Sequence, residues 1–382
     1  MKNSNFRFSD THSAHLSVDA ARPDIAIEAR SKAVATPMTS DEKTLKRVGV
    51  EMALVLSKWR DLGAKPFGTM SVSKTRNQPT LADAVTAIIA EQREGPKVTA
   101  AAINVTTKDI SYPTYGGSQA VRVYTPQTTI NTHGRRLPVI VYYHGGGWVT
   151  GSIDTYGASA MALARKCDAI VASVDYRHAP EHKFPAQHED AVNAYVWILQ
   201  NAKLWGGDPN CVALAGESAG GNLALNVAIM ARDMKLQRPV HMLLIYPVAG
   251  VEMNTPSYKK NADAMPLSRL AMDWFLQNTV KTAEDKLSPL LDILGRADLR
   301  DLPSATIITA EIDPLMSEGR MLADQLREAG TAVNYKNFSG VTHEFFGMDA
   351  VLVKAQRAQH VAAHDVKLAF AAHAIGLRQQ FA

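Results

Sequence analysis

The sequence has little cysteine, no concentrated charge and no long apolar run, and each shortage argues against a class of protein. Only two cysteines occur in 382 residues, Cys167 and Cys211, without a C-x-x-C spacing, which argues against structural disulfides and thiolate metal sites. The formal net charge of +4 is spread along the chain, so we expect no nucleic-acid partner. No segment resembles a signal peptide or a membrane span. We therefore expect a cytoplasmic protein without stable membrane insertion.

The remaining composition is that of an average soluble globular protein. Hydrophobic residues make up 46% of the chain and charged residues 20%, which supports a large core. No linker rich in proline, serine or glycine divides the sequence. At this length, the pattern favours one large α/β domain with an insertion over two separate domains.

Short apolar runs of strand length follow one another from about residue 100 onward. The first two alternate and contain β-branched residues, which is typical of exposed antiparallel strands. The next five runs are almost continuously apolar and are separated by amphipathic stretches of helix length, which is typical of parallel strands buried on both faces. A more polar segment over residues 332–338 is expected to form the last strand. We therefore predict an α/β fold with a mostly parallel, doubly wound sheet, whose eight strands contain residues 103–107, 121–124, 138–143, 169–174, 211–215, 242–246, 305–309 and 332–338.

Two segments break this alternation. Apolar residues at helical spacing predict a helix capped by Ser40 and extending to Trp59, and the interval between Pro247 and Pro303 is longer than one crossover helix needs. We expect both segments to form a lid over the carboxyl ends of the strands, where open α/β sheets bind ligands; an extra packing layer is the alternative. The predicted organisation is a flexible leader over residues 1–40, cap helices over 41–95, a main domain over 96–250 and 284–382, and a cap insertion over 251–283.

The pentapeptide Gly216-Glu217-Ser218-Ala219-Gly220 lies between an apolar strand run and a helix-forming stretch. In a Gly-x-Ser-x-Gly turn between a strand and a helix, the serine has a strained backbone and its hydroxyl projects above the sheet edge. This context favours a nucleophilic Ser218 over a serine in an ordinary structural turn.

A nucleophilic serine needs a base and an acid that orients the base, and both follow predicted strands. His343 follows the last strand and is the predicted base, with a surface-loop histidine as the alternative interpretation. Asp313 precedes Pro314 and is the predicted acid, although an aspartate there could instead cap a helix. Glu311 is the second choice for the acid. The chain order Ser218, Asp313, His343 is that of α/β-hydrolases.

The glycine-rich segment His144–Trp148 follows a buried strand run. Its three consecutive glycines let the backbone approach a substrate closely, so we expect this loop and the N–H of Ala219 to provide oxyanion donors. A phosphate-binding loop is the competing interpretation, but the glycine spacing does not fit nucleotide-binding patterns. We therefore expect no cofactor.

Further polar residues near the strand ends have structural explanations. His178 and His182 have a spacing seen in metal sites, but a proline lies between them and no third ligand is evident, so we expect no metal. Asp175 and Arg177 are expected to hold the loop after their strand through charge-assisted hydrogen bonds. We expect Glu217 to join that network.

Three motifs together resemble the hormone-sensitive-lipase-like esterases, bacterial family IV of the α/β-hydrolases, over about residues 95–375. These motifs are His144–Trp148, residues 175–181 with 184–186, and residues 216–221. The resemblance implies an α/β-hydrolase fold and a cap built from N-terminal helices and an insertion before the seventh strand. The sequence differs from the family pattern in two ways. Its N-terminal extension is longer, and His178 occupies a position where an apolar residue is more frequent.

The resemblance also implies roles for individual residues. Ser218 becomes the nucleophile, Asp313 the acid and His343 the base, so the main domain becomes the catalytic domain. The oxyanion donors become Gly146, Gly147 and Ala219. The same comparison makes His144, next to Gly145, a structural support for the oxyanion loop.

We therefore predict a serine carboxylesterase that hydrolyses short- to medium-chain acyl esters through an acyl-enzyme intermediate. An amidase, a carbamate hydrolase or an acyltransferase would use the same three residues, and a non-catalytic binder of small molecules is a further alternative. Trp148, Trp274 and Phe275 are expected to line an apolar substrate pocket, with core packing as the alternative role. The expected partner is a small ester, and the resemblance is consistent with a homodimer.

Overall fold

The computed structural model of the chain describes residues 40–92, 105–114, 117–127 and 136–380. The leader expected over residues 1–40 lies outside these ranges, apart from Ser40. By its internal contacts, the chain from Met38 to Ala382 forms one unit, so the cap segments and the main domain belong to the same body. No helix within the described ranges combines the length and hydrophobicity that crossing a bilayer requires.

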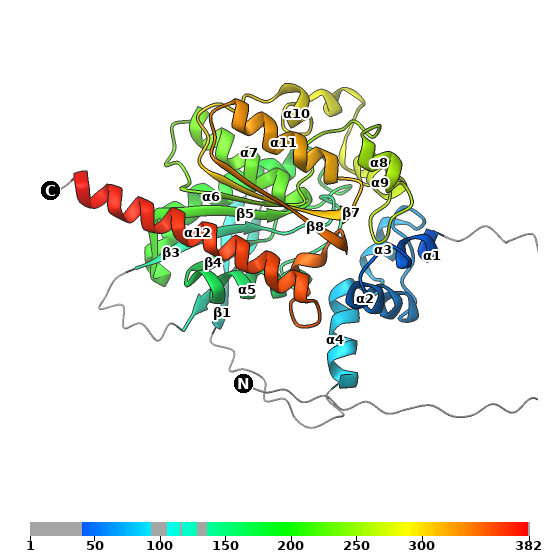
Figure 1. Cartoon of the computed structure of the whole chain (residues 1–382). Coiled ribbons are helices and arrows are strands. Elements are labelled where there is room, and N and C mark those ends of the chain that lie inside the picture. The colour runs from blue at the N-terminus through cyan, green and yellow to red at the C-terminus, as the bar shows by residue number, and fades with distance from the viewer. Residues whose placement is uncertain (1–39, 93–104, 115–116, 128–135, 381–382) are drawn as a thin grey trace, which may run out of the picture. The chain divides into compact units, whose positions relative to one another are not determined.

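One sheet of eight strands lies at the centre, in the order β1-β2-β4-β3-β5-β6-β7-β8 (Figure 1). β1 pairs antiparallel with β2 and β2 with β4, and all other neighbouring strands are parallel. The predicted mostly parallel, eight-stranded sheet is confirmed. The strands are β1 (Val105–Thr114), β2 (Gly117–Pro126), β3 (Leu137–Tyr143), β4 (Ile170–Val174), β5 (Gly207–Glu217), β6 (Met242–Ile245), β7 (Ala305–Ile312) and β8 (Val333–Thr342).

The central strands bury alternate side chains in two apolar cores, one on each face of the sheet. In β3, Val139 and Val141 belong to one core, and Ile140 and Tyr142 belong to the other. Burial on both faces explains why these strands read as continuous apolar runs. Helices cover both faces (Figure 1): α6 (Ala186–Asn201), α7 (Ala219–Asp233) and α11 (Met316–Glu328) on the first, α5 (Gly157–Cys167) and α12 (Val353–Gln380) on the second.

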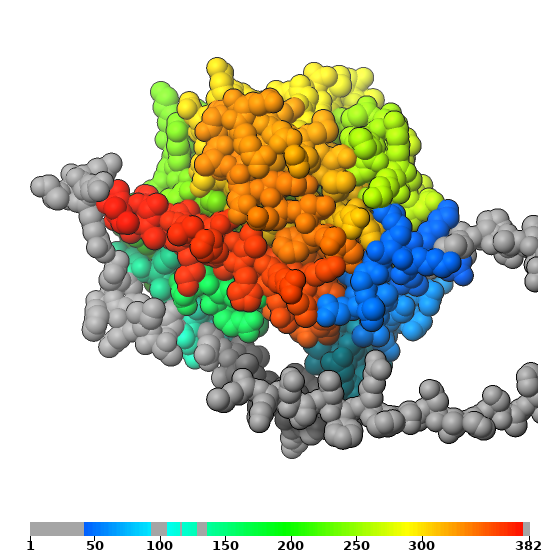
Figure 2. Space-filling view, in the orientation of Figure 1, coloured from blue at the N-terminus to red at the C-terminus, as the bar shows by residue number. Residues whose placement is uncertain are grey.

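The segments expected to form a cap are helical. The N-terminal segment contains α1 (Ser40–Leu45), α2 (Val50–Asp61), α3 (Val72–Arg76) and α4 (Leu81–Gln92), and the insertion contains α8 (Pro256–Lys260) and α9 (Arg269–Thr279). The Arg47 guanidinium links the two segments by donating to Asn261 Oδ1 at 2.6 Å. Figure 2 shows the N-terminal helices, in blue, packed against later parts of the chain. The remaining short helices are η1 (Ala202–Trp205), η2 (Glu284–Leu287), α10 (Ile293–Arg296) and η3 (Phe345–Gly347).

The prediction of one helix capped by Ser40 and running to Trp59 is wrong. Ser40 is itself helical, α1 ends at Leu45, and α2 begins at Val50. Between them Gly49 is extended, with φ −66° and ψ 159°, and its N–H donates to the Gly340 carbonyl at 2.8 Å. A backbone bond to a distant strand, β8, replaces the helical bond here, and local periodicity carries no information about such a contact.

Candidate active site

Ser218 lies in the turn between β5 and α7, at the carboxyl end of the central strand. Its φ of 56° and ψ of −118° are uncommon for a residue with a side chain. The surroundings hold this conformation, because the Ser218 N–H donates to the Ile245 carbonyl at 2.9 Å. A β-carbon on Gly216 would collide with the Gly220 carbonyl, and one on Gly220 with the Tyr143 carbonyl. The flanking glycines are therefore required by the close approach of the backbone.

The structure brings Ser218, His343 and Asp313 together from the ends of three strands. Nε2 of His343 lies 2.9 Å from Oγ of Ser218, and Nδ1 lies 2.6 Å from Oδ2 of Asp313. All three side chains are buried. The other oxygen of Asp313 accepts the N–H of Leu315 at 2.8 Å, so this carboxylate orients the imidazole and also caps the start of the following segment.

Asp313, rather than Glu311, provides the carboxylate behind the imidazole. Oε2 of Glu311 instead accepts the N–H of Gly340 at 2.9 Å. Burial by itself lowers the pKa of His343, but the charge of Asp313 and its hydrogen bond outweigh burial and raise the pKa above its ordinary value. The arrangement therefore increases the basicity of the nitrogen that faces Ser218.

Gly146 and Gly147 line the same cavity as Ser218, and Ala219 follows Ser218 directly at the start of α7. In the described part of the chain these three N–H groups donate to no acceptor, and Ala219 is the first residue of α7, where helical donors have no intrahelical partner. Gly146 and Gly147 have φ of 102° and 59°. A β-carbon on Gly147 would collide with the Phe275 ring. These donors are available to a negatively charged oxygen bound beside Ser218.

A small cavity opens at Ser218 between the sheet and the cap segments. The main domain and both cap segments line it, with Phe67, Gly146, Gly147, Ser218, Pro266, Leu267, Met272, Phe275, His343 and Glu344. A second cavity shares Phe67, Gly146 and Glu344 with the first and reaches the cap residues Gln78 and Thr80. The two cavities are thus neighbours, and the first of them contains the nucleophile.

Of the three aromatic residues expected in the substrate pocket, only Phe275 lines the cavity at Ser218. Trp148 is fully buried and belongs to the core on one face of the sheet, with its ring centroid 6.2 Å from that of His188. Trp274 packs against Gly68, edge-on to Phe275. Consecutive residues of a helix point about 100° apart, so Trp274 and Phe275 cannot both face the same cavity. For Trp148 the alternative role, core packing, is the observed one.

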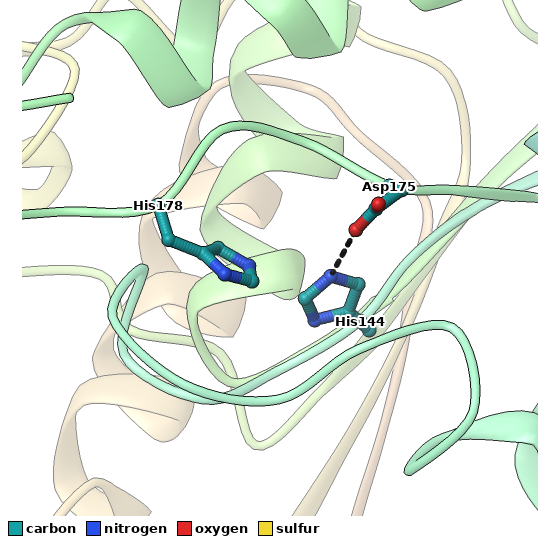
Figure 3. Close-up of side chains that lie close together, drawn as sticks. All are labelled: His144, Asp175 and His178. Atoms are coloured by element: carbon teal, nitrogen blue, oxygen red, sulfur yellow. Dashed lines mark ion pairs between the residues drawn. The ribbon is translucent and has the colours of Figure 1, made fainter. Parts of the chain in front are cut away.

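Arg177 holds the loop after β4 through charge-assisted hydrogen bonds, as expected, whereas the Asp175 side chain makes no such bond to the described residues. Arg177 forms a two-pronged ion pair with Asp190 of α6, with both N–O distances at 2.8 Å, and its backbone N–H also donates to Asp190. Asp175 instead lies 3.9 Å from Nε2 of His144 (Figure 3). The partner of Arg177 comes from a facing helix, and the spacing along the loop could not reveal it.

His144 contacts the loop in which it lies in several ways. Its Nδ1 donates to the Gly145 carbonyl at 2.8 Å, and its own carbonyl accepts the Tyr176 hydroxyl at 2.9 Å. The Tyr176 ring stacks on the imidazole with centroids 4.3 Å apart, and the Tyr156 ring lies 5.9 Å away. These contacts hold the backbone of the glycine loop in place.

Glu217 lies behind the nucleophile in a network separate from Asp175 and Arg177. Its carboxylate accepts the hydroxyls of Tyr142, at 2.6 Å, and Tyr246. Burial raises the pKa of Glu217, while the hydrogen bonds oppose this effect. The expectation that Glu217 joins the Asp175 network is therefore wrong, and the partners of this carboxylate are buried tyrosines.

Sequence reasoning missed three residues that surround the triad. Phe67 lines the cavity from a loop between Pro66 and Gly68, where no periodic pattern marks it. Glu344 follows His343 directly, and Tyr246 follows β6 at the carboxyl end of the strand. Position at a strand end was the available signal for Tyr246, since polar residues at these ends gather at one edge of the sheet.

Among the described residues, one group of side chains has the composition of a metal site: His144, Asp175 and His178, with ligand atoms within 4.8 Å of one another. His182, the partner that sequence spacing suggested for His178, does not belong to this group.

Comparison with known proteins agrees with this geometry. A family described as alpha/beta hydrolase fold matches residues 140–347, a range that includes Ser218, Asp313 and His343. The chain belongs to this family. The predicted fold and the resemblance to hormone-sensitive-lipase-like esterases are confirmed, because curated members named as esterases match this α/β-hydrolase over much of their length.

Two relatives illustrate the similarity of this α/β-hydrolase to characterised proteins. Carboxylesterase NlhH of Mycobacterium tuberculosis is 42% identical over 241 residues, which are 62% of this chain and 74% of that protein. Ethyl acetate hydrolase of Pseudomonas putida is 33% identical over 256 residues, which are 66% of this chain and 77% of that protein.

Solved structures support the same assignment for this α/β-hydrolase. An esterase from Pyrobaculum calidifontis has a TM-score of 0.69 and 35% identity and covers 81% of this chain and 96% of its own. A thermostable esterase from Pseudomonas putida ECU1011 has a TM-score of 0.73 and 27% identity, with 85% of this chain and 98% of its own covered.

Proposed function

We propose that this protein is a serine carboxylesterase that hydrolyses short- to medium-chain acyl esters through an acyl-enzyme intermediate. The observation that carries the proposal is the alignment of Ser218, His343 and Asp313, with contacts of 2.9 and 2.6 Å. Relatives named carboxylesterase, arylesterase and ethyl acetate hydrolase support it. Their names favour an ester over the amide and carbamate substrates that the same three residues could attack.

The first half of the proposed reaction acylates Ser218. His343 Nε2 accepts the hydroxyl proton while Oγ attacks the ester carbonyl carbon, and the loop glycines with Ala219 stabilise the negative carbonyl oxygen. The intermediate collapses when the imidazolium gives its proton to the alcohol oxygen, which leaves, and the acyl group stays on Ser218. Asp313 keeps the other imidazole nitrogen protonated and stabilises the transient positive charge.

Water completes the proposed cycle. His343 accepts a proton from water while the water oxygen attacks the acyl carbon, again with the carbonyl oxygen held by the backbone donors. The tetrahedral intermediate then expels Ser218 Oγ, which recovers its proton from the imidazolium. The products are one carboxylic acid and the free enzyme, so the cycle needs no further reactant.

The proposed acyl length follows from the small cavity at Ser218. Leu267, Met272 and Phe275 of the cap insertion form its apolar wall. An apolar cavity favours an acyl chain over a polar group, and limited volume favours short chains over long ones. This geometry supports short- to medium-chain esters.

We also propose a cytoplasmic location and a homodimer. Exposed apolar side chains on α12, Leu368 and Ile375, support association through that helix. Sedimentation of the purified protein at several concentrations measures the oligomeric state, and fractionation of the producing cells measures the location.

The decisive experiment compares the native enzyme with Ser218→Ala on p-nitrophenyl esters from acetate to dodecanoate. We expect the variant to lose on the order of 10⁴-fold or more in kcat, and we expect the native kcat/KM to be highest for the shorter acyl chains. A serine-directed phosphonate should add to Ser218 and to no residue of the variant, as measured by mass spectrometry. Equal turnover by the two proteins would overturn the proposal.

A further inference from the structure

His144, Asp175 and His178 meet beside the oxyanion loop, at the carboxyl ends of β3 and β4 (Figure 3). Their nearest ligand atoms all lie within 4.8 Å of one another, and Nε2 of His144 is 3.9 Å from Oδ1 of Asp175. None of these side chains acts as acid, base or nucleophile in the proposed ester hydrolysis. The cluster therefore calls for an explanation of its own.

The hydrogen bond of His144 shows that its ring presents a lone pair to the cluster. Nδ1 contacts the Gly145 carbonyl at 2.8 Å, and a carbonyl oxygen can only accept, so Nδ1 carries the proton. A neutral imidazole that carries its proton on Nδ1 has a lone pair on Nε2. Nε2 is then an acceptor. It is buried, has no hydrogen-bond donor among the described residues, and faces the oxygen of Asp175, which is a second acceptor.

His178 adds a second buried imidazole nitrogen. Its Nε2 likewise has no hydrogen-bond partner in the described part of the chain. The ring stands edge-on to the His144 ring, with centroids 5.4 Å apart and planes at 84°. A neutral ring in this position can direct a lone pair to the same point as His144 and Asp175.

We propose that His144, Asp175 and His178 form a binding site for a divalent transition metal, with Zn²⁺ as the best match. Two imidazole nitrogens and one carboxylate oxygen are a ligand set that Zn²⁺ accepts, usually in tetrahedral geometry. The Asp175 side chain is 32% exposed, which leaves a side open for a water ligand. Zinc lies about 2.0–2.2 Å from such ligands, so small side-chain rotations would draw the three atoms together.

Each nearby positive charge has an anionic partner, which offsets part of its repulsion of a bound cation. Arg76, which lies near His178, forms a two-pronged ion pair with Glu181 at 2.8 Å for both contacts. Arg122, near Asp175, pairs with Asp154 at 2.5 Å. Asp175 therefore remains the carboxylate that faces the two lone pairs.

A metal at this site would join two loops. His144 begins the glycine loop that carries the oxyanion donors, whereas Asp175 and His178 belong to the loop after β4. The metal would not touch the reacting atoms. Because it binds the folded arrangement and not the dispersed ligands of the unfolded chain, it would stabilise the folded protein in proportion to its occupancy.

The test uses untagged, full-length protein freed of metal with a chelator and titrated with Co²⁺, whose visible absorption reports ligand geometry. His182→Leu is the matched control, since His182 lies in the same loop, is exposed, and is outside the cluster. We expect native protein and control to bind one equivalent with a tetrahedral spectrum. His178→Leu should bind at least about a hundredfold more weakly.

Thermal unfolding with added Zn²⁺ provides a second measurement. Zinc should raise the Tm of the native protein and of His182→Leu, and leave that of His178→Leu unchanged. Asp175→Asn should lose the tetrahedral spectrum as well, so the test does not depend on the folding of one variant. The proposal is overturned if native protein gives no tetrahedral Co²⁺ spectrum, or if His178→Leu or Asp175→Asn retains it. Neither readout requires ester turnover, so this outcome is independent of the proposed function.

Discussion

The ring of Tyr246 packs against the imidazole of His343, with centroids 4.5 Å apart, while its hydroxyl donates to the buried carboxylate of Glu217. One side chain therefore supports the proposed base and at the same time satisfies a buried acid behind the nucleophile. Loss of the hydroxyl leaves the ring contact intact but removes a donor from Glu217.

We predict that Tyr246→Phe destabilises the protein by roughly 1–3 kcal/mol, the cost of an unsatisfied buried group, and lowers kcat/KM several-fold. Urea unfolding and ester turnover measure the two effects. Tyr195→Phe is the control, because that hydroxyl donates to the Gln237 carbonyl on another part of the molecule. The control should lose stability and keep its kcat/KM; an equal loss of turnover in both variants would contradict a local role for Tyr246.

Replacing the acid behind the imidazole should be far more damaging than replacing its neighbour. Asp313→Asn removes the carboxylate that holds Nδ1 of His343, and we expect kcat to fall on the order of 10⁴-fold. Glu311→Gln is the matched control, since Glu311 bonds to the Gly340 N–H and not to the imidazole. Ester turnover of both variants decides the point. A comparable loss of kcat in the two variants would mean that Asp313 is not the acid of the triad.

The activity should depend on pH through His343. Asp313 raises the pKa of the imidazole above its ordinary value of 6.5, despite burial. The ring must be neutral to accept the serine proton, so kcat/KM should fall as pH decreases through this raised pKa. We therefore expect half-maximal kcat/KM above pH 6.5 on the acid side of the profile. A profile that stays flat well below that value would exclude His343 as the base.

Phe275 should limit the length of the acyl chain. Its ring lines the cavity at Ser218 and lies against Gly147. Phe275→Ala should enlarge the cavity and raise kcat/KM for longer relative to shorter acyl esters by roughly tenfold or more. Trp274→Ala is the control, because Trp274 does not line the cavity. A panel of p-nitrophenyl esters measures the shift, and an identical shift in both variants would remove this role from Phe275.

Glu318 should make folding stability depend on pH. Burial raises its pKa to about 8, although the N–H groups of Ala249 and Gly250 donate to it at 2.9 and 3.1 Å. Between the ordinary value of 4.5 and about 8, the folded protein holds a proton that the unfolded chain releases, so stability from this group decreases as pH rises.

Glu318→Gln keeps an acceptor oxygen but cannot titrate. Relative to native protein, the variant should therefore gain up to about 1.4 kcal/mol of stability per pH unit across this interval. Urea unfolding at about pH 6 and pH 8 measures the difference. Parallel pH dependence of the two proteins would show that Glu318 titrates in the same way in both states.

Much of the fold and the core of the candidate site could be predicted from the sequence. The central strands are buried on both faces and give continuous apolar runs, while the more exposed β1 and β2 show alternation, so both kinds of strand were recognisable. Ser218, Asp313 and His343 each lie just past the end of a strand, and parallel strands place those positions at one edge of the sheet. For these residues local context carried enough information.

Contacts between distant segments could not be predicted in the same way. Phe67 reaches the cavity from an irregular loop, and Arg177 finds its partner Asp190 on a facing helix. The direction of Trp148 depends on a left-handed backbone with φ of 61°, which no spacing rule indicates. In each case the deciding interaction joins elements whose relative positions exist only after folding.

The hydrogen bond from Gly49 to Gly340 has a mechanical consequence for the proposed enzyme. It joins the first residue before α2 to the strand end that carries His343, and Glu51 strengthens the junction by accepting the N–H of Val353 at 3.0 Å. Gly340 lies three residues before His343 in the chain, so an outward movement of α2 would break this bond and disturb the strand end that positions the imidazole. The packing of the N-terminal segment and the alignment of the base are therefore coupled.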